Sequence, residues 1–368
     1  MKKLHVDRKL FLERAGLARW KNSLARRHKQ YDVNRFYKEE TFRGRRRIVA
    51  PKYISVYTFE DKKSSPYTET MRFLSAIERE FKVSDCYVDF RGTESISAAA
   101  MVVVYAAIDL ARKEPGRLGN AEILWSNQSE RVNAVLKSNN FHKLIRGYEI
   151  SYSLDSVRSM PVISSVGSDQ MEEVIDFIQR RIYKERMSPD TEHVYGDAVS
   201  ETINNVRLHA YPEFKKEDKR WWLVCTTIGK MLYLAIYDKG IGIPKTVVER
   251  PWFLSSLKHT NPEEYAILEE QFPEVKKGLV NIFTANNISD EKLIFLSMQG
   301  DVTGTKADKH GQGSKSIMAL VNDTAGGQLW VFSNGGLYRF KQSDAKPDLY
   351  CLPKKFPGTL VQWNIELP

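Results

Sequence analysis

From residue 53 onward, the sequence alternates between short β-rich runs and longer runs with helical periodicity. The ranges 53–59, 86–90 and 121–125 are predicted as strands, and the ranges 66–81, 97–113 and 127–140 as helices. Strands that alternate with helices are typical of layered α/β folds. This alternation predicts a mixed α/β (α+β) protein, and its 368 residues are enough for about two or three domains.

The apolar and cysteine patterns predict a protein of the cytoplasm. The longest apolar run, 98–108, is too short to span a bilayer and ends at Asp109, so we interpret it as a buried helix. No apolar run of the secretory kind follows the basic first residues. Cys86, Cys225 and Cys351 are too widely spaced to indicate a CxxC metal site or a disulfide framework. We therefore expect no membrane association.

The positive charge is concentrated in the first residues of the chain. Residues 1–52 contain 17 Lys and Arg against five Asp and Glu, so this segment carries +12 while the whole chain carries +10. Its densest point is 43-RGRRR-47. A basic patch can attract nucleic acid or an acidic protein, whereas a solvated basic helix that binds neither has the same composition. Both interpretations of residues 1–52 stay open.

Two segments of the first half combine a strand, a serine-containing turn and a helix with a second strand–helix pair. They are 87-YVDFRGTESISAAAMVVVYAAID-109 and 121-AEILWSNQSERVNAVLKSNNFHKLI-145. Over about residues 53–165, this pattern resembles a STAS domain, the fold of anti-sigma-factor antagonists. The resemblance implies a phosphorylated serine in the turn, for which Ser95 and Ser97 are the candidates. The family's Asp-Ser-Ser-Gly is missing here, however, and Ser97 is also suited to capping its helix.

A polar stripe is predicted in the second half, within 201-ETINNVRLH-209. Glu201, Asn205 and His209 are spaced four residues apart, and this spacing places them on one face of an α-helix. Leu208 is expected on the apolar side of the same helix. A stripe of this kind is often only a solvated polar face, so its interpretation depends on the motifs nearer the C-terminus.

Three glycine-containing turns come after the stripe in order. The first ends the β-rich run 231-MLYLAIYDKGIGIP-244, the second opens the helix in 310-HGQGSKSIMALV-321, and the third begins the last strand in 357-PGTLVQWNIELP-368. Glycine permits positive φ and close backbone approach, and the backbone amides at a helix start attract phosphate. Each of these turns is common by itself.

Taken in order, the stripe and the three turns resemble the GHKL, or Bergerat-fold, ATPases and kinases, and their pattern is most similar to the anti-sigma-factor type. The resemblance covers about residues 187–368. It implies a Bergerat-fold α/β sandwich that binds ATP together with Mg²⁺. Dimerisation on ATP occurs in several branches of that superfamily, so a homodimer is a further expectation.

The resemblance implies a role for each matching residue. Asn205 would ligate Mg²⁺, and Glu201 would act as general base toward the attacking water. Asp238 would accept a hydrogen bond from the adenine amino group. His209 would either contact phosphate or cap the C-terminal end of its helix. The other implied ATP contacts are Gly240, Gly242 and Thr359 around the adenine, and Gly311, Gly313, Ser314 and Lys315 around the phosphates.

The predicted organisation has four parts. They are a basic N-terminal segment (1–52), a STAS-like α/β domain (53–165), a linking helix (166–190) and a GHKL ATP-binding domain (191–368). The stretch 245–309 is long for an ATP lid, and the ranges 262–272 and 290–299 have helical patterns. We therefore expect an elaborated helical lid with 300–311 as its flexible end.

Three functions of different kinds are consistent with the sequence. The leading hypothesis is a Mg²⁺-dependent ATPase whose slow hydrolysis works as a conformational switch controlling a protein partner. The second is an anti-sigma-type serine/threonine protein kinase. The third is a non-catalytic ATP-sensing module that binds its partner, protein or nucleic acid, through residues 1–52. No motif names the partner.

Overall fold

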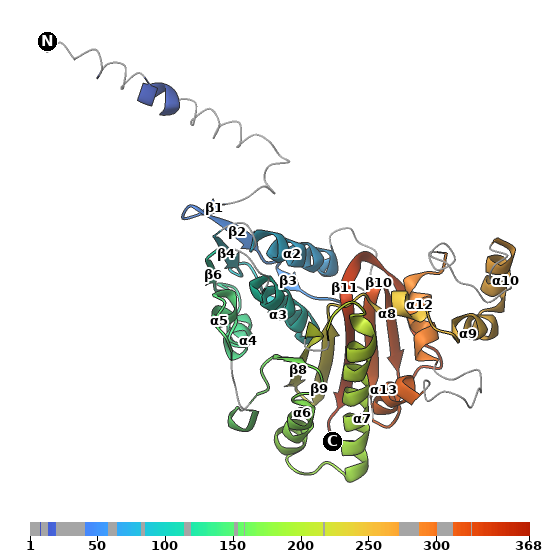
Figure 1. Ribbon diagram of the computed structural model, residues 1–368. Coiled ribbons are helices and arrows are strands. Elements are labelled where there is room, and N and C mark those ends of the chain that lie inside the picture. Colours follow the sequence, from blue (N-terminus) through green and yellow to red (C-terminus); the bar gives the residue numbers. More distant parts are fainter. Residues whose placement is uncertain are drawn as a thin grey trace.

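The computed structural model consists of helices packed on β-sheets (Figure 1). The structure describes residues 8, 14–19, 41–57, 65–81, 85–113, 119–150, 154–157, 159–215, 218–271, 287–299, 312–324 and 326–368. The predicted mixed α/β fold class is confirmed, because helices and several sheets alternate along the chain.

The N-terminal unit, defined here as residues 41–150, is built on a four-stranded sheet. Its strands, in spatial order, are β1 (Thr41–Phe42), β2 (Arg45–Val49), β4 (Cys86–Asp89) and β6 (Ala121–Leu124). β2, β4 and β6 run parallel, and β1 forms an antiparallel hairpin with β2. A separate parallel ladder joins β3 (Tyr53–Ile54) and β5 (Ser95–Ile96). The helices are α2 (Pro66–Glu80), α3 (Ala98–Lys113), α4 (Glu130–Ser138) and α5 (Phe141–Ile145).

The C-terminal unit, residues 154–368, is built on a five-stranded antiparallel sheet. Its strands, in spatial order, are β10 (Gln328–Lys341), β11 (Asp348–Glu366), β9 (Met231–Asp238), β8 (Arg220–Ile228) and β7 (Ile163–Val166). One face of this sheet packs against α6 (Met171–Phe177), α7 (Pro189–Asn205) and α13 (Gln312–Asn322). Short helices η2 (Leu154–Ser156), η3 (Ile178–Ile182) and η4 (Val206–Ala210) complete this layer.

Serine caps and prolines define where the long helices begin. Ser65 and Ser188 each accept a hydrogen bond from a backbone N–H three residues later, and a proline follows each of them in the first helical turn. Ser129 caps α4 in the same way. Ser97 accepts a hydrogen bond from the N–H of Ala100 at 3.3 Å, so the predicted cap of α3 is confirmed.

Helix α3 is buried on nearly every side. Twelve of its 16 residues are buried, and it packs against α2 and α5 of its own unit and against β8 and β9 of the C-terminal unit. The run 98–108 is therefore a buried helix, as predicted, and its apolar character on all sides follows from contact with both units. One continuous core joins the two units through this helix.

The second sheet is consequently covered on both faces. Trp222 and Tyr237 belong to the core that contains α3, whereas Trp221 and Ile236 belong to the core with α6, α7 and α13. Side chains alternate between faces along a strand. Asp238, two residues after Ile236, therefore faces the helices of the C-terminal unit.

Strand β10 reverses its direction within its own length. Asn334 has a φ of 49°, the left-handed conformation of an Asn-Gly hairpin turn. Beyond the turn the chain returns, since the N–H of Gln342 donates to the carbonyl of Gly327 at 2.9 Å. Likewise, the Arg339 guanidinium lies 5.3 Å from the centre of the Trp330 ring. The turn therefore lies at the end of the sheet where β9 also ends.

The predicted lid region forms a helical element with its own small core. It contains α8 (Ile243–Val247), α9 (Phe253–Thr260), α10 (Pro262–Gln271) and α12 (Asp290–Met298). Their buried residues include Val247, Phe253, Leu268 and Leu293, which make a cluster separate from the other two cores. The helices predicted at 262–272 and 290–299 are thus confirmed, while the range 300–311 lies outside the described residues.

Three strands lie elsewhere than the predicted division of the chain would place them. β1 and β2 fall within the range 1–52, yet β2 pairs with β4 in the first sheet. β7 falls at the end of the range 53–165, yet it pairs with β8 in the second sheet. The linking range 166–190 contains α6, η3 and the start of α7.

The strand predicted at 53–59 is shorter in the structure. Only Tyr53–Ile54 forms a ladder, and residues 55–57 have no regular structure. The backbone N–H of Ser55 donates to the hydroxyl of Thr70, and that of Tyr57 donates to the hydroxyl of Ser55. These side chains take the place of a neighbouring strand, which ends the ladder. Residues 58–59 lie outside the described part.

Candidate functional site

Three polar side chains from adjacent strands lie in a row at one end of the second sheet. Asp238 of β9 pairs in register with Thr359 of β11, and Thr359 pairs with Ser333 of β10. By strand alternation, all three face the layer of helices that includes α7. Asp238 and Thr359 are 5% and 8% exposed, and Ser333 is fully buried. The row therefore forms the polar floor of the candidate site.

The Asp238 carboxylate is buried, and within the described part of the chain no positive charge compensates for its burial. Its Oδ1 accepts a hydrogen bond from the backbone N–H of Gly240 at 2.8 Å. Burial raises the pKa of Asp238 to about 7, and the hydrogen bond from Gly240 only partly opposes this rise. Among the described residues, no cationic side chain contributes to this balance. An additional hydrogen-bond donor would strongly stabilise the ionised form of a buried carboxylate that has no cationic partner.

The glycines around Asp238 are required by close packing. A Cβ on Gly240 would overlap the backbone of Ala210 at the end of η4, and a Cβ on Gly358 would overlap the carbonyl of Asp238. Gly242 has a φ of 90°, and a side chain there would press against β10. The two glycine motifs predicted from sequence therefore allow the backbones of η4, β9, β10 and β11 to approach one another closely.

The first half of the predicted polar stripe is present on α7. Glu201 and Asn205 are both half-buried and interact through their side chains. Burial raises the pKa of Glu201 above its ordinary value, and Asp197 adds to the rise while the hydrogen bond with Asn205 opposes it. The N–H of Ile241 donates to the carbonyl of Ala210 at 2.8 Å, so the helix end is bonded directly to the glycine turn after Asp238.

The spacing of the stripe changes after Asn205. Val206–Ala210 is a π-helical turn, which contains more residues than an α-helical turn. The step from Asn205 to His209 therefore does not repeat the step from Glu201 to Asn205. The expectation that Leu208 lies on the apolar side is wrong for the same reason, because Leu208 is 66% exposed. His209 is half-buried.

The third motif lies on a helix that packs along α7. Helix α13 begins at Gln312, so Gly313, Ser314 and Lys315 occupy its first turn and do not form a separate loop. Ser314 is half-buried and Lys315 is exposed. Gly311 lies outside the described residues.

A cluster of ligands that would hold a metal without help from a substrate is absent from the described residues. No group of three or more His, Cys, Asp or Glu side chains is arranged for metal binding in that part of the chain. Mg²⁺ bound with a nucleotide needs few protein oxygens, since phosphate and water supply the others. Asn205 is compatible with such a site, because its side chain is a neutral oxygen donor beside an acid.

The densest basic cluster of the sequence takes part in ion pairs within the N-terminal unit. Arg45 contacts Glu122 at 3.0 Å, Arg46 contacts Glu80, and Arg47 contacts Asp89 at 3.2 Å. The strand β2 that carries these arginines was expected to be part of a basic arm. Its charge stabilises the first sheet, which leaves Arg43 at the hairpin turn as the exposed arginine of 43–47.

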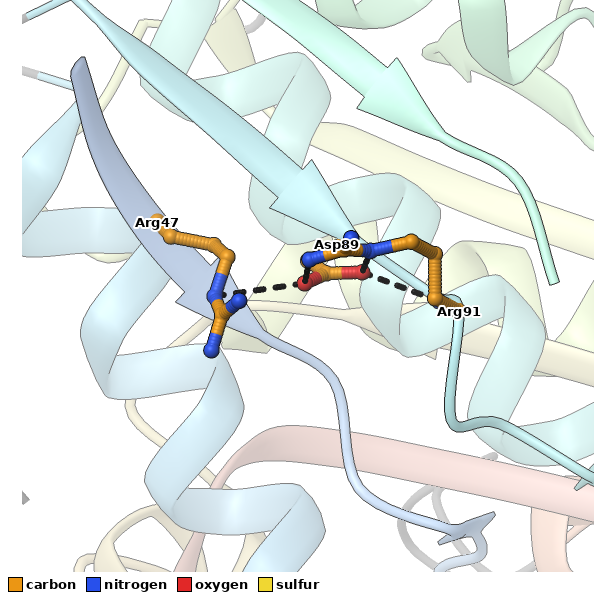
Figure 2. A network of polar contacts seen from close by, with 3 residues as sticks. All are labelled: Arg47, Asp89 and Arg91. Carbon is orange, nitrogen blue, oxygen red and sulfur yellow. Dashed lines mark hydrogen bonds and ion pairs between the residues drawn. The ribbon is translucent and has the colours of Figure 1, made fainter. Parts of the chain in front are cut away.

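Asp89 lies at the centre of the most buried of these ion pairs (Figure 2). Arg91 binds both of its carboxylate oxygens, at 3.0 and 2.9 Å, while Arg47 approaches from β2. Burial of Asp89 acts to raise its pKa, but the hydrogen bonds from Arg91 and the positive charges of Arg91 and Arg47 outweigh it and hold the pKa below its ordinary value. The ion pair between Arg47 and Asp89 ties β2 to β4.

The two candidate phosphorylation sites differ in their surroundings. Ser95 is exposed on the short strand β5. Ser97 is half-buried and holds the first turn of α3 through Ala100.

Sequence reasoning missed several residues that shape the site. Ser333 and Asn334 contact the glycine turn, with the Asn334 side-chain amide donating to the carbonyl of Ile241 at 3.1 Å. Lys239, next to Asp238, forms an ion pair with Glu78 on α2. The turn residues 333-SNGG-336 were a local signal for a hairpin, but only the strand register places Ser333 beside Thr359.

Comparisons with known proteins add no further assignment. No protein-family model matches the sequence, and no curated protein matches it. Among the described residues, no helix is long and apolar enough to cross a membrane.

Proposed function

We propose that the C-terminal unit is a Bergerat-type ATP-binding fold and that the protein is a Mg²⁺-dependent ATPase with slow turnover, used as a conformational switch. The observation that carries the proposal is the Asp238 carboxylate, buried at the end of β9 with the Gly240 N–H as its hydrogen-bond donor. Adenine carries an exocyclic amino group that donates where guanine carries a carbonyl oxygen. The adenine amino group would therefore provide the Asp238 carboxylate with a second hydrogen-bond donor.

The base and the phosphates would contact different residues of the candidate site. Asp238, Thr359 and Gly242 would surround the adenine. Asn205, one turn before Ala210 at the glycine turn, would face the phosphate side, together with Ser314 and Lys315 in the first turn of α13. Asn205 would hold Mg²⁺, whose charge would neutralise the phosphate oxygens when it is bound. The backbone N–H groups at the start of α13 suit the same phosphates.

Glu201 is the residue that would support hydrolysis. It lies one helical turn before Asn205 and interacts with it, so both would face the same water and phosphate. Its pKa is raised mainly by burial, which makes it a better proton acceptor than an exposed glutamate. Glu201 would orient the attacking water and take its proton.

Contact between the two units supports the switch. Lys239 is part of the glycine turn that follows Asp238, and its partner Glu78 lies on α2 of the N-terminal unit. A change of that turn on nucleotide binding would therefore reach the N-terminal unit directly. The protein partner would respond to that conformational change.

The test is ATP binding and turnover with Mg²⁺, measured by calorimetry and by release of radiolabelled phosphate. We expect the unchanged protein to bind ATP and Asn205→Ala to lose the Mg²⁺ dependence of binding. Glu201→Gln should bind ATP, while phosphate release falls by about 100-fold or more, the usual effect of removing a general base. Asn204→Ala, at the position preceding Asn205 on α7, is the matched control. It should change neither ATP binding nor phosphate release.

Three outcomes separate the alternatives. Absence of ATP binding by the unchanged protein rejects the proposal. Unchanged turnover in Glu201→Gln rejects Glu201 as the base but leaves ATP binding standing. Label transferred to protein, with little free phosphate, would assign kinase activity in place of hydrolysis.

A further inference from the structure

Ser333 of β10 joins the start of α8 to β11 at the floor of the candidate site. Its hydroxyl accepts a hydrogen bond from the N–H of Ile243 at the start of α8, at 2.9 Å. The same hydroxyl lies 3.0 Å from the hydroxyl of Thr359 and 3.3 Å from the carbonyl of Gly358. Ser333 is fully buried, so water does not compete for these contacts.

The single proton of the Ser333 hydroxyl has two acceptors within reach. Hydroxyl-to-oxygen hydrogen bonds have lengths of about 2.5–3.0 Å. The separation from Thr359 falls within that range, while the separation from Gly358 exceeds it. The Ile243 N–H already occupies one lone pair of Ser333. Either hydroxyl of the Ser333–Thr359 pair can donate, and Ser333 can also donate to the Gly358 carbonyl. The shorter separation favours Ser333 donating to the Thr359 oxygen.

We propose that Ser333 is a positioning residue that directs the proton of Thr359 toward the position proposed for the base. When Thr359 accepts a hydrogen bond from Ser333, its own proton is free to be donated on the opposite side. Thr359 is 8% exposed, and it faces the same layer as Asp238. This inference rests on the proposed function, because it assigns the base specificity of the same site.

The resulting pattern matches one purine edge and opposes another. Asp238 presents an acceptor and Thr359 presents a donor, directly or through one water. Adenine offers the complementary pair, an amino donor and the N1 acceptor. Hypoxanthine has the same size but carries a carbonyl oxygen and an N1–H donor at these positions. Without Ser333, the Thr359 hydroxyl would rotate freely and could accept from that N1–H.

The experiment compares ADP with inosine diphosphate as probes for the unchanged protein and for Ser333→Ala. Binding is measured by calorimetry at pH 8, where Asp238 is ionised in the folded protein. We expect the preference for ADP, the ratio of the dissociation constant of inosine diphosphate to that of ADP, to fall by roughly three- to tenfold in Ser333→Ala. This is the size of one ordinary hydrogen bond. Loss of ADP affinity should account for most of the change.

A double-mutant cycle tests whether Ser333 acts through Thr359. In a Thr359→Val background, Ser333→Ala should leave the ratio unchanged, because no hydroxyl is left to orient. Ser126→Ala is the matched control. Ser126 is also buried and bonds to three backbone groups, but it lies in the N-terminal unit. It should leave the ratio unchanged even if it lowers the melting temperature.

The outcomes distinguish this inference from the proposed function. If the unchanged protein binds neither probe, the proposed function fails and the inference fails with it. If it prefers ADP and Ser333→Ala keeps the same ratio, or weakens both probes equally, the inference alone is overturned. A ratio that still changes in the Thr359→Val background would also overturn it, since Ser333 would then act through α8.

Discussion

A buried carboxylate with one backbone donor is the residue-scale feature on which the candidate site depends. Asp238 is held in place by its own turn, because Gly240 donates to it and Gly358 allows β11 to approach. Ionising a carboxyl group in this setting costs free energy in the folded protein but not in the unfolded chain. The site therefore keeps Asp238 ready for a donor at the expense of stability.

That cost predicts a specific dependence of stability on pH. The folded pKa of Asp238, about 7, lies above the unfolded value of 3.8. Its contribution to stability is therefore fully present below about pH 4 and is lost as the pH rises through 7. Asparagine cannot ionise, so the stability of Asp238→Asn relative to the unchanged protein should rise by roughly 3 kcal/mol from pH 5 to pH 8. Urea unfolding without nucleotide measures the difference, and a pH-independent difference would contradict it.

Local motifs predicted part of the site, and contacts between strands determined the rest. Asp238, Gly240 and the Gly-Thr pair could be identified because each is a short signal within one turn. Ser333 could not, because its role comes from the register between β10 and β11 and from a turn 90 residues earlier. Leu208 shows the opposite limit, since regular α-helical spacing predicted it on the apolar side, whereas it is 66% exposed within a π turn.

At the scale of elements, a polar anchor fixes α3 against the second sheet. Asp109 on α3 is buried and accepts hydrogen bonds from the indole N–H of Trp222 at 3.0 Å and from the hydroxyl of Ser164 at 2.9 Å. Lys113, one turn later, pairs with the same carboxylate at 2.8 Å. The otherwise apolar helix therefore has one polar contact that sets its position relative to β7 and β8.

Removing this anchor should be costly. Asp109→Ala would leave the Trp222 indole N–H buried without its acceptor, and we expect a loss of about 2–4 kcal/mol in the free energy of unfolding. Asp176→Ala is the matched control, because Asp176 and Arg180 form an ion pair with the same spacing on an exposed helix face. Its effect should be below about 1 kcal/mol. Similar losses in both variants would show that Asp109 has no anchoring role.

At the scale of the whole molecule, the two units share a core, which the sequence did not predict. Strand and helix patterns placed most elements correctly, but a pattern shows only that a face is apolar and not which surface covers it. The arginines of β2 concealed a strand, because charged residues hide the alternation that predicts one. The division between residues 52 and 53 failed to account for the ion pairs that tie β2 into the first sheet.

The shared core predicts how the C-terminal unit behaves alone. A fragment of residues 154–368 would expose Trp222, Tyr237, Phe332 and Phe356, each no more than 2% exposed in the full chain. An apolar patch of this kind promotes association and binds hydrophobic dyes. We therefore expect the fragment to self-associate and to bind such a dye strongly, as measured by light scattering and fluorescence. A monomeric fragment with the near-ultraviolet circular dichroism expected for packed tryptophans would contradict this.

Helix α3 also limits how such a protein can be rearranged. A helix that packs against α2 and α5 of one unit and against β8 and β9 of the other cannot be exchanged together with one unit without uncovering apolar side chains of the other. Recombination that moves either half into another chain would have to bring a replacement helix of the same width and apolar character. Each half therefore has its own sequence motifs, but neither can be replaced independently of the other. A redesign of either half must begin at α3.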